Sequence, residues 1–167
     1  VITQPDSLCW LLNIRGSDVP RTPIIQCFAV ISSDGNVTLF CDPLKFSKVN
    51  LNFNVSLLDW DNFAPYLQSF EGKILIDPSS MPHAAMEALE MGSSETIRSI
   101  DPCALPKACK NDVELVGARA AHLRDGAAIV EFLAWFDTAD KSSLSEIDIV
   151  EKLEGFRAAT KLLHDIS

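Results

Sequence analysis

Ile24–Phe40, with the sequence IIQCFAVISSDGNVTLF, predicts a β-hairpin at the centre of the fold. Its first half, Ile24–Ile31, is an almost continuous apolar run, SSDGN supplies turn residues, and Val37–Phe40 follows as the second strand. A strand that is apolar at nearly every position is typical of burial on both faces, which requires helices above and below the sheet. The stretch therefore predicts an α/β domain.

Further strands are predicted on both sides of the hairpin. Lys73–Asp77 (KILID) and Thr96–Asp101 (TIRSID) have the composition of short strands, and each is followed by a proline. Val1–Thr3 has the pattern of the end of a buried strand, so we expect the chain to have been cut from a longer protein.

Two helices are predicted between these strands. Apolar residues fall at helical spacing through LLDWDNFAPYLQSF, which includes Leu58, and Pro65 is expected in the first turn of that helix. A second helix is predicted in SSMPHAAMEALEM, with Ser80 as its cap and Gly92 as its end. Strands that alternate with helices of this length indicate an α/β architecture.

The C-terminal third of the chain has a different character. A segment with two prolines predicts a linker at 103–110, between an α/β domain at 1–102 and a helical part at 111–167. Asn111 and Glu114 fit a capping box at the start of a long helix that becomes apolar nearly all round after Gly126. A second helix is expected after a Ser145 cap. Two helices do not make a domain, so we expect them to be the first layer of a larger one.

Composition excludes several classes of function. The chain has 47% apolar and 22% charged residues and a net charge of −9, which is typical of a soluble globular protein and unfavourable for nucleic acid or anionic lipid. Apolar runs stay below the roughly 18–20 residues that a membrane-spanning helix needs. The five cysteines are expected to be reduced thiols in a cytoplasmic protein, with metal binding by Cys103 and Cys109 as the less favoured interpretation.

The loop NIRGSDVP contains the candidate site residues Arg15 and Asp18. In one interpretation this is a substrate-side loop, in which Arg15 grips a carboxylate and Asp18 acts as a base. In the other, favoured interpretation the two side chains pair with each other and lock the loop structurally.

Other candidates have weaker support. His83, His122 and His164 are scattered, and His122 is expected to be solvated or ion-paired between Arg119 and Asp125. Zinc-protease, nucleophile-elbow, P-loop and dinucleotide motifs do not occur in the sequence. The residues present therefore predict neither a catalytic site nor a metal site within this chain.

Three motifs in order, WLLNIRGSDV from Trp10, KACKNDVELVGARAAHLRD from Lys107 and a later Glu-x-x-Arg, resemble the three-domain cytosolic Xaa-Pro aminopeptidases of the creatinase/prolidase superfamily. The resemblance implies that 1–102 is a non-catalytic, creatinase N-terminal-like α/β domain of the ribonuclease H-like type with a mixed sheet. It implies that the helical segment opens a catalytic pita-bread domain.

The resemblance also implies the chemistry of a longer parent protein. In that family two divalent metal ions, usually manganese, activate a water that removes the residue preceding proline from a peptide. The metal ligands lie on later strands, so no ligand is expected in this chain, which would act as a scaffold, dimerisation and substrate-access region. The parent is expected to be a homodimer that acts on proline-containing peptides.

Two alternatives remain open on the sequence. The chain could be a non-enzymatic α/β interaction module, or the same fold could belong to a prolidase or a creatinase-type hydrolase.

Overall fold

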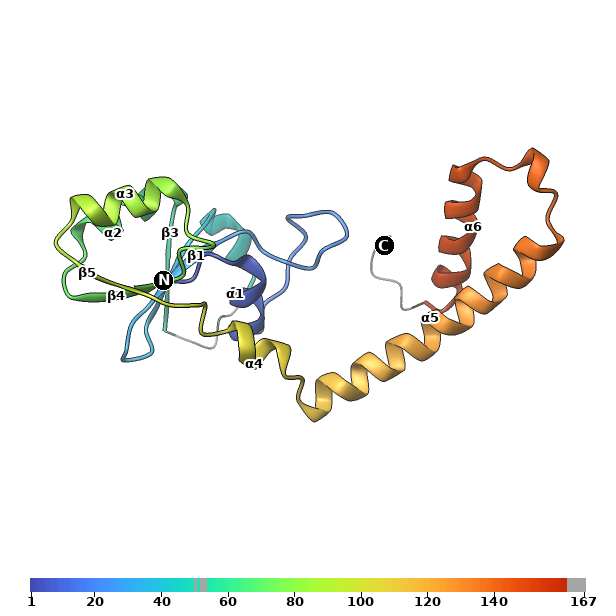
Figure 1. Ribbon diagram of the computed structural model, residues 1–167, viewed down its shortest axis with the longest axis horizontal. Coiled ribbons are helices and arrows are strands. Elements are labelled where there is room, and N and C mark those ends of the chain that lie inside the picture. The colour runs from blue at the N-terminus through green and yellow to red at the C-terminus, as the bar shows by residue number, and fades with distance from the viewer. Residues whose placement is uncertain (50, 52–53, 162–167) are drawn as a thin grey trace. The chain divides into compact units, whose positions relative to one another are not determined.

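The computed structural model describes residues 1–49, 51 and 54–161, in which the chain forms two compact units, Val1–Ala108 and Cys109–Ser167 (Figure 1). The first unit is a mixed α/β structure and the second is helical, as the sequence predicts. Each unit is described by itself.

The strands of the first unit form a three-stranded mixed sheet and a two-stranded parallel sheet. β1 (Phe28–Ile31) and β2 (Val37–Phe40) pair antiparallel and confirm the predicted hairpin. β3 (Val55–Leu58) runs parallel to β2, and β4 (Lys73–Ile76) runs parallel to β5 (Glu95–Arg98).

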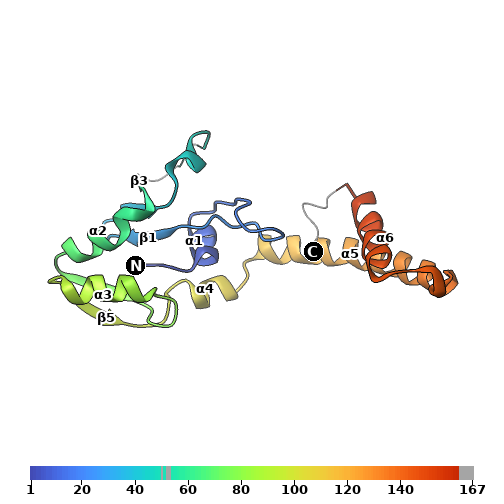
Figure 2. The same cartoon turned by 90° about the horizontal axis from the view of Figure 1, so that it is seen from above.

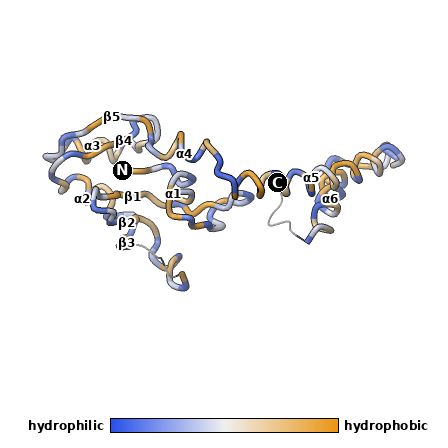
Figure 3. Tube along the Cα trace, turned by 90° about the horizontal axis from the view of Figure 1, so that it is seen from below, coloured by the Kyte–Doolittle hydropathy of each residue, from blue (hydrophilic) through white to orange (hydrophobic). Residues whose placement is uncertain are grey.

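The segment Val1–Thr3 lies between these two sheets (Figure 3). Ile2 and Ala29 of β1 exchange two backbone hydrogen bonds of 2.9 Å, and the backbone nitrogen of Val1 donates to the carbonyl oxygen of Leu75 at 2.7 Å. Ile2 thus forms an isolated β-bridge with Ala29, and the segment links β1 to β4.

Helices cover both faces of this arrangement, so successive residues of the hairpin enter different apolar clusters. α1 (Pro5–Leu11) and α4 (Ala104–Ala108) belong with one face, whereas α2 (Phe63–Ser69) and α3 (His83–Met91) pack beside each other on the other. Ala29 of β1 lies in the first cluster with Leu8, and its neighbour Val30 lies in the second with Leu67. Burial on both faces, predicted from the unbroken apolar run, is confirmed.

Several local predictions are wrong. Leu58 ends β3 and does not belong to a helix, because its partner β2 supplies a parallel ladder that local spacing does not reveal. α3 begins after Pro82 without a side-chain cap, since Ser80 is held by Thr3, whose Oγ1 donates to the Ser80 carbonyl oxygen at 3.0 Å. The strand predicted from Ile24 begins only at Phe28. Pro65 and Gly92 lie as predicted, in the first turn of α2 and at the end of α3.

α4 occupies the segment expected to be a linker. Cys103, just before it, is 5% exposed and belongs to the core cluster of α1. Lys107 within it forms an ion pair with Asp6 and lies 3.4 Å from the Ser7 hydroxyl at the start of α1. The short helix is therefore fastened to the first unit.

The second unit contains α5 (Asp112–Thr138) and α6 (Glu146–Ala159), which contact each other and cross at an angle (Figures 1 and 2). Asn111 and Ser145 cap them, and both predicted caps are confirmed as reciprocal capping boxes. Arg157 joins α6 to Asp125 of α5, with Nε 2.7 Å from Oδ1. The described residues of the two units also form three 3₁₀ turns, η1 (Pro43–Phe46), η2 (Trp60–Asn62) and η3 (Lys141–Ser143).

Candidate functional site

The loop that follows α1 is held to the body of the first unit by Arg15. Its Nη1 donates to the carbonyl oxygens of Cys9 at 2.6 Å and Ile14 at 2.8 Å. Both acceptors lie at the end of α1 or just after it, where helix carbonyls lack partners within the helix. The Cys9 carbonyl oxygen also accepts from the Ile14 N–H at 3.1 Å, so the guanidinium adds charge-assisted hydrogen bonds to a turn that the backbone already closes after α1.

Asp18 anchors the other side of the loop. Its Oδ2 accepts a hydrogen bond from the backbone N–H of Gln26 at 2.7 Å and contacts Lys45 Nζ at 2.5 Å. Desolvation acts to raise the pKa of Asp18, but the hydrogen bonds from Lys45 and Gln26 outweigh it and lower that pKa below its ordinary value. A carboxylate with a lowered pKa is a weak proton acceptor, so this geometry favours an anchor over a general base.

Gly16 lies between these two anchors, and because it has no side chain the loop backbone can pack closely against the core. A Cβ placed on it would lie 2.4 Å from Cγ1 of Ile25, which is 7% exposed. The Ile25 N–H donates to the buried sulfur of Cys9 at 3.3 Å, which fixes the same strip of backbone. The base of the loop is thus packed tightly, whereas Ser17 and Pro20–Pro23 are exposed.

The expected pair between Arg15 and Asp18 is not formed in the described structure, since each side chain bonds to other groups. Their spacing of three residues suggested the pair, but the chain turns at Gly16 and directs them to different partners. Lys45 is the residue that the sequence did not reveal. It comes from η1, 27 residues after Asp18, and no local pattern joins the two.

The candidate histidines remain apart from one another. His83 is exposed and lies 3.5 Å from Glu87, one turn further along α3, and His122 is exposed on α5. Asp125, the expected neighbour of His122, pairs with Arg157, and His164 lies outside the described residues. Within residues 1–49, 51 and 54–161, no three His, Cys, Asp or Glu side chains gather in a group able to hold a metal ion.

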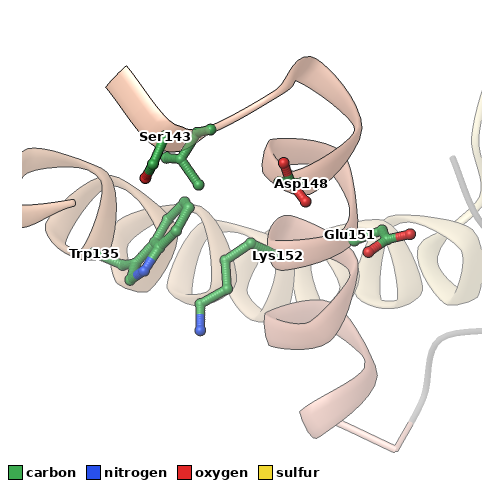
Figure 4. A pocket seen from close by; sticks show the side chains of 6 residues that line it. Trp135, Ser143, Asp148, Glu151 and Lys152 are labelled. Carbon is green, nitrogen blue, oxygen red and sulfur yellow. The ribbon is translucent and has the colours of Figure 1, made fainter. Parts of the chain in front are cut away.

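The second unit contains an open hollow of about 430 Å³ between the end of α5, η3 and α6 (Figure 4). Lys152 lies 5.3 Å from the ring centroid of Trp135, and Asp148 is occupied by the capping box with Ser145. These contacts are those of a packing surface, in which cation–π pairs and a helix cap account for the charged side chains.

The five cysteines are all free thiols, of which Cys109 is exposed and the other four are buried. Burial raises the pKa of Cys27 to about 12 and, together with Asp101, that of Cys103 to about 11. These two thiols are therefore protonated and unreactive at neutral pH. Along the described chain, no helix has both the length and the apolar character needed to cross a membrane.

Comparison with known proteins identifies similarity along most of the chain. The family model described as the creatinase/prolidase N-terminal domain matches residues 1–114. Xaa-Pro aminopeptidase 1 of Dictyostelium discoideum is 34% identical over 168 residues, which are 94% of this chain and 26% of the relative. A probable Xaa-Pro aminopeptidase P of Aspergillus niger is 32% identical over 182 residues, covering 100% of this chain and 30% of the relative. The chain thus spans about a quarter to a third of the length of these relatives.

Solved structures show a similar fold. The prolidase from Pyrococcus horikoshii superposes with a TM-score of 0.58 at 16% identity, over 94% of this chain and 43% of that structure. The prolidase from Pyrococcus furiosus gives a TM-score of 0.56 at 14% identity, over 93% and 43%. At this identity the likeness concerns the fold alone.

Proposed function

The chain belongs to the creatinase/prolidase N-terminal domain family, and from this premise we propose that it is the part of a Xaa-Pro aminopeptidase that precedes the metal site. The parent protein would remove the N-terminal residue before a proline by hydrolysis. The observation that carries this proposal is the identity of 32–34% to Xaa-Pro aminopeptidases along 94–100% of the chain, although the chain is only 26–30% of their length.

In this proposal the first unit is a non-catalytic scaffold and the second opens the catalytic domain. Support comes from α5, whose apolar residues Val113, Leu123 and Val130 are 82%, 78% and 66% exposed. A helix with such a surface needs cover that the described residues do not supply. We propose that further strands and helices of the parent, in a pita-bread arrangement, provide that cover.

The metal chemistry is assigned to the remainder of the parent. The described residues do not fit a metal centre, because they bring no three candidate ligands together. We propose that two divalent metal ions, the manganese pair that the family resemblance implies, are held by residues of the parent outside this chain, where a metal ion can activate water for peptide hydrolysis.

The substrate, assembly and cell compartment are further parts of the proposal. Proline-containing peptides would be the substrates and the parent would be a homodimer in the cytoplasm. The four buried thiols, free in the described structure, agree with a reducing compartment. Light scattering of the full-length protein at several concentrations tests the dimer.

The decisive experiment measures hydrolysis of an Xaa-Pro peptide with added Mn²⁺, using the 167-residue chain and the full-length product of its gene side by side. We expect hydrolysis by the full-length protein alone. Hydrolysis by the short chain would contradict the assignment of the metal site. No hydrolysis by either, with both proteins folded, would favour a non-enzymatic interaction module.

A substitution in the parent separates the two interpretations of the loop. Arg15→Ala removes the hydrogen bonds to Cys9 and Ile14, so we expect a lower Tm with an unchanged kcat/KM for a proline peptide. Arg98→Ala, at an exposed arginine of β5, is the matched control and should change neither quantity. A raised KM for Arg15→Ala without loss of stability would instead place Arg15 on the substrate side.

A further inference from the structure

The open end of the β1–β2 hairpin carries two cysteines that lie opposite each other. The register pairs Phe28 with Phe40, so the next position toward the open end pairs Cys27 with Cys41. Both thiols are completely buried and belong to the same apolar cluster, that of α1. Because successive side chains of a strand point to opposite faces, membership of one cluster means that the two thiols lie on the same face of the sheet.

The hydrogen-bond pattern determines how closely the two backbones approach at this position. Ser32 N–H donates to the Asn36 carbonyl oxygen, and bonded and non-bonded pairs alternate from there along the hairpin. Cys27 and Cys41 form a non-hydrogen-bonded pair, and Cys41 N–H donates instead to the carbonyl oxygen of Leu58 in β3 at 2.9 Å. The Cα atoms of such pairs lie about 4.5 Å apart, and a disulfide accepts Cα separations of about 4.4–6.8 Å. The hairpin can therefore hold a disulfide here without a change of register.

A third thiol, Cys9 of α1, belongs to the same cluster but has different contacts. Its sulfur accepts a hydrogen bond from the Ile25 N–H at 3.3 Å, whereas the Cys27 thiol donates to the Ile25 carbonyl oxygen at 3.6 Å. Cys9 comes from a helix, so its separation from Cys27 is set by side-chain packing and not by a strand register. The register therefore makes Cys41 the partner of Cys27.

We propose that Cys27 and Cys41 are an oxidation site, at which a low-molecular-weight disulfide converts the two thiols to a cross-strand disulfide. The thiolate of one cysteine attacks a sulfur of the reagent and releases one thiol. The second cysteine then attacks the protein sulfur of the resulting mixed disulfide and releases the second thiol. The two cysteines lose two electrons and two protons, which the reagent takes up as it becomes two thiols.

Burial determines when this exchange takes place. It raises the pKa of Cys27 to about 12, with smaller contributions from the neighbouring Cys41 and Cys9, so the folded protein holds very little thiolate at neutral pH. Exchange therefore proceeds while the chain folds, or while the end of the hairpin opens and the thiols reach solvent. Once the bridge is formed, the same burial shields it from other thiols.

The bridge acts on the loop that Asp18 anchors. Gln26, whose N–H donates to Asp18, directly precedes Cys27, and η1, which contains Lys45, begins shortly after Cys41. The two segments that hold the Asp18 carboxylate thus adjoin the two cysteines. A covalent link between the cysteines keeps these segments together when the loop opens. This inference does not depend on the proposed enzymatic function.

Disulfide mapping after oxidative refolding tests the proposal. The 167-residue chain with Cys109→Ser, which removes the exposed thiol, is refolded with an excess of oxidised glutathione or with a reductant only. Free thiols are alkylated, and cleavage before Asp34 in the hairpin turn separates the two cysteines for mass spectrometry. We expect a Cys27–Cys41 link and, relative to the reduced protein, a urea midpoint of the first unit that is raised by roughly 1 M. The Gln26 amide should exchange about tenfold more slowly in the linked protein.

Two variants serve as controls. Cys41→Ala removes the partner of Cys27, so its urea midpoint should be the same after refolding in either buffer. Cys9→Ser retains an acceptor for the Ile25 N–H and should keep both the link and the shift of the midpoint.

Either of two results would overturn the proposal. A main link between Cys27 and Cys9, or no link at all, would mean that the strand register does not select the partner. A Cys27–Cys41 link that lowers the urea midpoint would mean that the hairpin cannot hold the bridge without distortion.

Discussion

Replacement of Gly16 by alanine should destabilise the first unit, because the new methyl group has no room. Its Cβ would lie 2.4 Å from Cγ1 of Ile25 and 3.2 Å from the Ile24 carbonyl oxygen, whereas ordinary contacts begin at 3.4 Å. One side must therefore move by about 1 Å, since 3.4 − 2.4 = 1.0. Ile25 is 7% exposed within the core, so it has little freedom to move.

The magnitude follows from two opposed effects. Overpacking of a core costs about 1–3 kcal/mol, whereas the lower entropy of unfolded alanine returns about 0.4–1 kcal/mol. We expect a net loss of about 1–2 kcal/mol in the free energy of unfolding. With a urea m-value of about 1–3 kcal/mol/M, the midpoint should fall by roughly 1 M.

Urea unfolding followed by tryptophan fluorescence measures this change. In a Trp135→Phe background the remaining tryptophans, Trp10 and Trp60, both report on the first unit. The matched control is Gly117→Ala in α5, where the added Cβ meets nothing within 4 Å and helix propensity favours alanine. It should leave the transition of the first unit unchanged. A Gly16→Ala protein as stable as its parent would refute the close packing of the loop on Ile25.

Three further results are expected. Asp18→Asn should lower the free energy of unfolding at pH 7 by about 1 kcal/mol, because the contact with Lys45 is lost. The pKa of Asp18 is lowered in the folded protein, so the carboxylate stabilises the fold at pH values above its ordinary pKa of 3.8. This stabilisation is lost as the pH falls through the folded pKa. Equal urea midpoint differences at pH 7 and pH 2.5 would contradict this sign. Asn111→Ala should cost about 1 kcal/mol, seen as faster amide exchange in the first turn of α5, and unchanged exchange would exclude the cap. A thiol reagent should modify Cys109 rapidly and the four buried thiols, including Cys27, only after unfolding, so that rapid labelling of a second thiol would contradict their burial.

The fold was predictable where a local pattern and its packing agree. The apolar run before the SSDGN turn indicated a strand buried on both faces, and Ala29 and Val30 of that strand do enter opposite clusters. Asn111 and Ser145 were predictable as caps because a cap depends only on residues three positions apart. β3 was not predictable in the same way, since Leu58 also fits the helical spacing of the next segment and only its parallel pairing with β2 decides its state.

The candidate site was predictable in position but not in its contacts. The loop with Arg15 and Asp18 is held in place by hydrogen bonds from these two side chains. Its glycine and its charged residues indicated a fixed loop. Its partners are the carbonyl of Cys9 and the amine of Lys45, which lie six and 27 residues away from their respective side chains. Contacts of that kind follow from how α1 and η1 are brought together, and no spacing in the sequence encodes them.

The attachment of α4 to α1 determines how this protein can be dissected. A cut after Pro102 would remove Cys103, which fills the core, and Lys107, the ionic partner of Asp6. The remaining piece would expose apolar surface on α1 and leave the Asp6 carboxylate without its counter-charge. A recombinant first unit should therefore extend to Ala108, and any fusion protein that includes this unit should include α4 as well.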